Sequence, residues 1–204
     1  MIKQPEEGEI WEWRAFGQLS KELADRVQAY PIRMALLNIP GEDIYFISDC
    51  SNHNIKLRKY DDRWILKFKL LLGGTPGDAE LYNESAAFSY SFPVEPERLK
   101  FAASLLQVRL RHEPASSLSS DEFTRELENA SPSVSVASVR KVRSQFEFEG
   151  GWLELADVQF PKHYTQSISI HSPEKTTVSL MRERLAPGTG WEVMNYVDAC
   201  RKWF

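Results

Sequence analysis

The sequence lacks the features that mark membrane-spanning and secreted disulfide-rich proteins. None of its 204 residues lies in an apolar run approaching the roughly 20 residues that a membrane helix needs. The start of the chain, M-I-K-Q-P-E-E-G-E, has no apolar core of the kind found in signal peptides. Only two cysteines occur, Cys50 and Cys200, and they are far apart and in no paired motif. We therefore expect a cytoplasmic protein with free thiols and no membrane segment.

Two further absences limit the possible ligands. The glycine-rich stretch 73–77, G-G-T-P-G, is not closed by Gly-Lys-Ser/Thr, so it predicts a hairpin loop and not a phosphate-binding P-loop. The formal net charge is −4 and the pI is about 5.7, which gives no specific signal for nucleic-acid binding. With 42% hydrophobic and 26% charged residues, the chain has the composition of a folded globular protein. We expect a single domain covering residues 1–204.

Against this negative balance, basic residues gather between positions 54 and 70. This stretch predicts two strands joined at a pair of aspartates, and it contains six basic residues against two acids. Because side chains alternate along a strand, Lys56 and Arg58 share one face of the first strand, and Lys67 and Lys69 share one face of the second. The opposite faces are apolar. The pattern fits either a site for an anionic ligand or a hairpin whose charged face is solvated.

Other predicted strands divide their residues in the same way. In the strand 9–16, Glu12 and Arg14 lie on the parity opposite to two tryptophans. In the long hairpin strand 136–149, Lys141 and Arg143 lie opposite to valine and phenylalanine. Apolar stripes on the predicted helices match the apolar strand faces, so the charged faces are left to face one another. The sequence therefore predicts an α+β fold, an eight-stranded antiparallel β-barrel with a charged interior and helices packed outside.

The remaining expected elements complete this count of about eight strands and four or five helices. Further strands are predicted at 43–48, 152–160 and 165–171, with a strand ending at Pro93 within 80–94 and a strand or buried turn at 34–39. Helices are predicted at 19–30, 95–107, 121–129, 174–185 and 191–203. The third of these follows the capping box Ser119-x-x-Glu122 and lies in a polar helical excursion near 112–135.

Taken in order, these motifs resemble the CYTH superfamily, the triphosphate tunnel metalloenzymes. That pattern has an acidic-basic first strand, a strand with two basic residues, a strand ending in lysine, a K-x-R strand, L-D and E-I-E strands, and a closing helix marked by tyrosine. The matching positions are Glu12-Trp13-Arg14, Lys56-Leu57-Arg58, Lys67 or Lys69, Lys141-Val142-Arg143, Leu153 to Val158, Ser167 to His171, and Trp191 to Tyr196.

The resemblance implies a closed tunnel in which cations hold a triphosphate and carboxylates hold Mg²⁺ or Mn²⁺. The implied substrate-binding residues are Arg14, Lys56, Arg58, Lys67, Lys69, Lys141 and Arg143. The implied metal ligands are Glu12, Glu154 and Asp157. The implied partner is an anionic, phosphate-containing small molecule, whereas the oligomeric state and any catalytic residue stay open.

The acidic half of the pattern is incomplete in this chain. Positions where the pattern has carboxylates hold Ile10, Ser167, Ser169 and His171, and its aspartate falls on Ala156 or Asp157. We therefore predict that the barrel binds a triphosphate- or polyphosphate-type anion, with at most weak metal-dependent phosphohydrolase activity. The alternative is a catalytically inactive tunnel-fold protein that binds or scaffolds an unknown ligand. In a third interpretation the interior charges pair with one another and hold no ligand.

Overall fold

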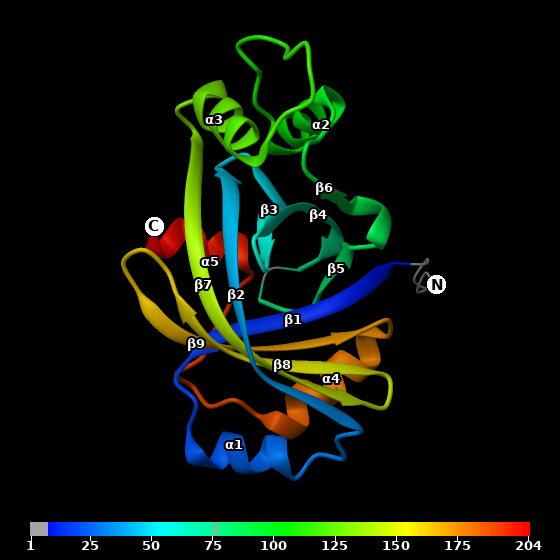
Figure 1. The fold of residues 1–204 in the computed structure, drawn as a ribbon. Coiled ribbons are helices and arrows are strands. Elements are labelled where there is room, and N and C mark those ends of the chain that lie inside the picture. The colour runs from blue at the N-terminus through cyan, green and yellow to red at the C-terminus, as the bar shows by residue number, and fades with distance from the viewer. Residues whose placement is uncertain (1–7, 76) are drawn as a thin grey trace.

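The computed structural model describes residues 8–75 and 77–204 and contains a closed barrel of eight antiparallel strands (Figure 1). The strand order around the barrel is β1-β5-β4-β3-β2-β7-β8-β9, and β9 pairs with β1 to close the ring. The barrel strands are β1 (Glu9–Gly17), β2 (Met34–Ser48), β3 (Ser51–Tyr60), β4 (Arg63–Gly74), β5 (Glu80–Asn83), β7 (Val134–Phe148), β8 (Gly151–Gln159) and β9 (Tyr164–Ser172). The predicted fold class is confirmed.

Two short strands lie outside the ring. The strand β6 (Ser89–Ser91) pairs with β4, and β10 (Glu192–Val193) pairs with β1. The region 80–94, predicted to hold a strand ending at Pro93, contains two strands, the second ending at Ser91. It is divided into β5, the 3-10 turn η1 (Ala86–Phe88) and β6.

The strand β2 is much longer than the sequence predicted. The segments 34–39 and 43–48, predicted as separate, form one strand that continues through Pro40 and Gly41. Its whole length pairs with β7, whereas β3 begins to pair with it only at Asp43. Pro40 therefore lies where β2 has an open edge, and proline is tolerated there because its missing N–H leaves no ladder partner unsatisfied.

Five helices lie around the barrel in the described part of the chain. They are α1 (Lys21–Gln28), α2 (Pro96–Leu106), α3 (Ser120–Ala130), α4 (Lys175–Leu185) and α5 (Tyr196–Trp203). The predicted capping box is present at α3, where Ser119 and Glu122 satisfy each other's backbone N–H groups. The last helix is shorter than predicted because Asn195 caps it at Asp198 N and the residues before it form β10. None of these helices has the length and apolar character needed to cross a membrane.

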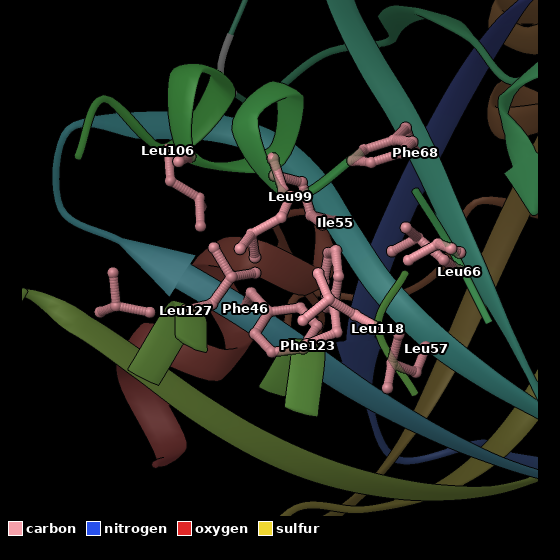
Figure 2. Close-up of a cluster of buried hydrophobic side chains, with 14 residues drawn as sticks. Phe46, Ile55, Leu57, Leu66, Phe68, Leu99, Leu106, Leu118, Phe123 and Leu127 are labelled. Atoms are coloured by element: carbon pink, nitrogen blue, oxygen red, sulfur yellow. The ribbon is translucent and has the colours of Figure 1, made fainter. Parts of the chain in front are cut away.

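Two apolar clusters pack helices against the outside of the barrel. The first lies between α2, α3 and the outer faces of β2, β3 and β4, and Figure 2 shows it in close-up. The labelled members are Phe46, Ile55, Leu57, Leu66, Phe68, Leu99, Leu106, Leu118, Phe123 and Leu127. The second cluster joins α1 and α4 to the outer faces of β1, β8 and β9. Burying these outer faces leaves the other strand faces inside the barrel.

A third apolar cluster fills one end of the barrel interior. It combines strand residues such as Phe16, Val139 and Val158 with Val197 and Cys200 of α5. The helix α5 therefore covers this end, and charged side chains occupy the part of the interior beyond it. The barrel holds a polar cavity with an apolar floor.

Candidate functional site

The barrel interior contains a cavity of about 520 Å³. All seven cations that the sequence analysis named as substrate-binding residues line it. They are Arg14, Lys56, Arg58, Lys67, Lys69, Lys141 and Arg143. Four carboxylates share the lining, Glu9, Glu12, Glu84 and Glu154. Cations are thus in excess inside a protein whose overall charge is negative.

Strand register explains why residues so distant in sequence meet here. Directly paired residues of antiparallel strands project to the same face. Gln145 pairs with Glu154, Glu154 with Ser169, and Ser169 with Arg14, so one row crosses four strands. On the other side of the barrel, Lys56 pairs directly with Lys67.

One buried carboxylate that the sequence analysis did not identify gathers the cations of β3 and β7. Asp43 accepts two hydrogen bonds from Arg58, at 2.8 and 2.9 Å, and one from Lys141 at 2.8 Å. The Lys56 ammonium lies 3.7 Å away, and the Tyr45 hydroxyl donates to the same carboxylate. Burial alone would raise the pKa of Asp43, but the surrounding cations outweigh it and hold that pKa well below its usual range.

A second group forms around Glu12 on β1. The Glu12 carboxylate accepts from Arg14 Nε at 2.8 Å and from Lys69 Nζ, and His171 Nδ1 lies 3.6 Å away. Lys69 also contacts Glu84 at 3.1 Å. Burial would raise the pKa of Glu12, yet the neighbouring cations lower it well below its usual range. This carboxylate is ionised and fully engaged with cations.

Arg14 links that group to Glu154 on β8. The Arg14 guanidinium lies 3.5 Å from Glu154, which also contacts Arg143 at 3.8 Å and accepts from Gln145 at 3.1 Å. Although burial opposes ionisation, Arg14 and the other charges lower the pKa of Glu154 to about 2. Both predicted metal ligands inside the cavity are therefore ion-paired.

Aromatic rings form the floor beneath these charges. The Tyr196 ring, at the start of α5, lies 3.5 Å from Lys141 Nζ and 4.4 Å from Arg14 Cζ. It stacks on Tyr45, with ring centroids 5.5 Å apart. Such cation–π contacts hold the two cations in place without neutralising them. The tyrosine of the closing helix is thus part of the cavity.

Two lysines remain with little or no compensation. Among residues 8–75 and 77–204 the Lys67 side chain has no ion-pair or hydrogen-bond partner, and the Lys56 ammonium has the 3.7 Å contact with Asp43 and lies 5.3 Å from the Tyr45 ring centroid. Like charges directly opposite each other on neighbouring strands are destabilising. Burial and the nearby Arg58 charge lower the pKa of Lys56 well below its usual range, because Asp43 offsets only part of their effect.

Three buried polar atoms at the cavity also lack hydrogen-bond partners within the described residues. They are Asn54 Oδ1, Arg143 Nε and His171 Nδ1. Buried polar groups in folded proteins are nearly always satisfied, so each unsatisfied group calls for an explanation. The Arg143 guanidinium supplies a donor for an oxygen-rich ligand, since arginine has no acceptor capacity.

The carboxylates do not form a site for Mg²⁺ or Mn²⁺ in this arrangement. No three His, Cys, Asp or Glu side chains in the described ranges come together in a way that could hold a metal ion. Magnesium needs several oxygen ligands in near-octahedral geometry, and here the oxygens of Glu12 and Glu154 are held by Arg14, Lys69 and Arg143.

The third predicted metal ligand, Asp157, lies apart from the other two. It has the opposite strand parity to Glu154, lines a separate groove on the barrel exterior, and accepts hydrogen bonds from Tyr164 and Gln166. The structure therefore does not bring Asp157 together with Glu12 and Glu154. The residues that replace glutamates in the pattern, Ile10 and His171, do line the cavity.

Two residues that the sequence analysis missed are Asp43, which binds cations of the cavity lining, and Trp152, which lines the cavity itself. Asp43 has the same strand parity as Tyr45 and Ile47, which lie inside the barrel, and this was the available signal. Trp152 lies at the cavity with its ring stacked on His171, at a centroid distance of 4.9 Å. No motif marked either residue.

A closed antiparallel barrel with this cationic interior has the triphosphate tunnel fold, as the resemblance to the CYTH superfamily implied. Solved structures support the fold. A Hippeastrum protein described as a candidate adenylyl cyclase with a dominant triphosphatase activity superposes with a TM-score of 0.53 at 14% identity, over 95% of each chain. A candidate adenylate cyclase from Bacillus halodurans superposes with a TM-score of 0.51 at 12% identity, over 94% of this chain and 98% of that chain.

A conserved hypothetical protein from Pyrococcus furiosus gives a TM-score of 0.50 at 14% identity, over 92% of this chain and 98% of that one. No protein-family model matches the sequence, and no curated protein matches it. At these identities the likeness concerns the fold, and the function must be argued from the cavity.

Proposed function

We propose that this protein binds a triphosphate- or polyphosphate-type anion inside the barrel. The observation that carries the proposal is the direct pairing of Lys56 with Lys67 across two strands, both facing the cavity. A barrel interior that only neutralised itself would place a carboxylate opposite one of them. An anion with several phosphate groups compensates both ammonium groups at once.

The arrangement around these lysines fits a chain of phosphates better than a single small anion. Arg143 offers an unsatisfied Nε, and Arg58 and Lys141 are held in position by Asp43. The cations thus come from β3, β4 and β7, on different parts of the cavity wall. Fixed cations at several positions match the spaced negative charges of a polyphosphate.

The proposal is tested by calorimetric titration with inorganic triphosphate. The double variant Lys56→Met/Lys67→Met should bind at least about a hundredfold more weakly, since a hydrogen bond to a charged group contributes about 1.5–3 kcal/mol. The control is Lys59→Met, because Lys59 is an exposed lysine on the same strand that faces outward, toward Trp64. Equal binding by the double variant and the parent would refute the proposal.

The same double variant separates a binding role from a structural one. If the two lysines serve binding, their removal relieves like-charge repulsion, and the ligand-free variant should be at least as stable as the parent toward urea. If they serve the fold, the variant should lose stability without ligand.

For hydrolysis, we propose that turnover is slow. The cations contact a bound phosphate chain before and during reaction alike, and uniform binding does not accelerate a chemical step. The carboxylates that could support a metal are engaged with Arg14, Lys69 and Arg143. Phosphate release from triphosphate over a Mg²⁺ and Mn²⁺ series measures this, and fast release that is lost in Glu12→Gln would contradict it.

A further inference from the structure

A second hollow, which we call the mouth groove, adjoins the cationic cavity. This groove has a volume of about 610 Å³ and shares Gln145, Trp152 and Pro173 with the cavity. Its other lining residues are Arg33, Met34, Leu36, Glu147, Phe148, Gly150 and Gly151. The two hollows therefore adjoin at the three residues that they share.

The groove is formed by the same sheet face that lines the cavity. Met34 pairs with Glu147, and Leu36 pairs with Gln145. The cavity residue Arg143 lies two positions before Gln145 on β7, so their side chains face the same side of the strand. Residues paired in this way share a face. On the inner face of the β2–β7 pair, whose strands run side by side in Figure 1, cations thus give way to the apolar side chains of β2 opposite Gln145 and Glu147 of β7.

The apolar side chains on this face are unusually accessible. Met34 is 51% exposed and Leu36 is 48% exposed, although both lie on the cavity-side face. The strand β3 pairs with β2 only from Asp43 onward, so no strand covers this part of β2 on its other edge. Neighbouring exposed apolar side chains that border a polar site mark surfaces that bind apolar groups.

The charges in the cavity and in the mouth groove favour different parts of a ligand. Glu147 lines the groove, and within the described residues its carboxylate has no ion-pair or hydrogen-bond partner, although its backbone carbonyl accepts from Arg33 N at 2.8 Å. Arg33, the groove's one cation, lies 3.6 Å from Glu149. The phosphates are therefore favoured among the cavity cations, and the groove favours a part of the ligand that carries no negative charge.

We propose that the ligand is a phosphate-chain ester whose apolar organic group lies in the mouth groove against Met34, Leu36 and Trp152. This inference rests on the proposed anion binding in the cavity and adds the chemical class of the ligand. It distinguishes an ester with an apolar group from free inorganic polyphosphate and from a strongly polar nucleoside ester.

The experiment compares octyl triphosphate with methyl triphosphate by calorimetric titration, because the two differ only in apolar chain length. The parent should bind the octyl ester at least tenfold more tightly, which corresponds to about 1.4 kcal/mol. In Met34→Gln/Leu36→Gln this preference should disappear. The matched control is Leu72→Gln/Leu180→Gln, which changes two similarly exposed leucines that line neither hollow and should keep the preference.

The outcomes separate the two proposals. If neither ester binds, the proposed anion binding itself fails. If both esters bind equally to the parent, or if the glutamine variant keeps the octyl preference, the anion site stands and the groove assignment is overturned. Tighter binding of ATP than of octyl triphosphate would also overturn it, since the groove would then recognise a polar heterocycle.

Discussion

Replacing Asp43 by asparagine removes the charge that the cations of β3 and β7 share. In the parent, this carboxylate is 2% exposed, accepts hydrogen bonds from Arg58 and Lys141, and lies 3.7 Å from Lys56. Asparagine keeps the size of the side chain but leaves these buried cations without a counter-charge. The variant should therefore lose stability in the absence of any ligand.

The size of this stability loss follows from the burial of the Asp43 carboxylate. Breaking a buried ion pair from one side costs about 3–5 kcal/mol. For a chain of this length each kcal/mol lowers Tm by about 2–4 °C, so the expected decrease is roughly 6–20 °C. The control is Asp78→Asn, because Asp78 also contacts two cations but is 41% exposed at its side chain. Such a surface pair contributes about 0–1 kcal/mol.

Asp43→Asn has a second consequence if the cavity binds anions. The barrel interior of this variant is more positive than that of the parent, so inorganic triphosphate should stabilise the variant more than it stabilises the parent. Urea unfolding followed by circular dichroism, with and without triphosphate, measures both effects. A variant within 1 kcal/mol of the parent, or one that gains no more from triphosphate than the parent does, would refute this reasoning.

Three other outcomes are expected. The ionised Glu154 contributes stability that is complete above its unfolded-state pKa of about 4.3 and is lost as the pH falls toward its folded-state pKa of about 2. The difference in unfolding free energy between the parent and Glu154→Gln, measured in urea, should therefore shrink from about pH 5 to about pH 2.5. Because the pKa of Lys56 is lowered in the free protein and a bound anion would raise it, triphosphate binding should become coupled to proton uptake as the pH rises, seen as a buffer-dependent binding heat that is smaller in Lys56→Met. Leu99→Ala should cost about 2–5 kcal/mol in urea unfolding yet leave triphosphate affinity within about threefold, since Leu99 packs outside the barrel.

Strand alternation carried most of the site prediction. Lys56, Lys67 and Arg143 each lie on the parity opposite to apolar residues, so the sequence separates them from the apolar face, and the folded barrel turns that polar face inward. The resemblance to a known pattern added the order of the motifs. Closure of the ring follows from long-range pairing of β1 with β9, which local patterns do not show.

The errors have equally local causes. Glu154 and Asp157 are three residues apart in one strand, so their side chains face opposite sides of the barrel wall. They therefore cannot be ligands of one site. Asp43 was overlooked because its partners Arg58 and Lys141 belong to other strands and only the folded register brings them to it. Tyr196 acquires its role from the position of α5 at the barrel end, which helix periodicity does not specify.

The most direct test of anion binding in the barrel is a crystal structure of the protein grown with inorganic triphosphate. We predict electron density for the phosphate chain inside the cavity, with phosphate oxygens within hydrogen-bond distance of Lys56 Nζ and Lys67 Nζ and of the Arg143 guanidinium. A triphosphate bound only on the outer surface, with both lysines unchanged and uncontacted, would contradict the account.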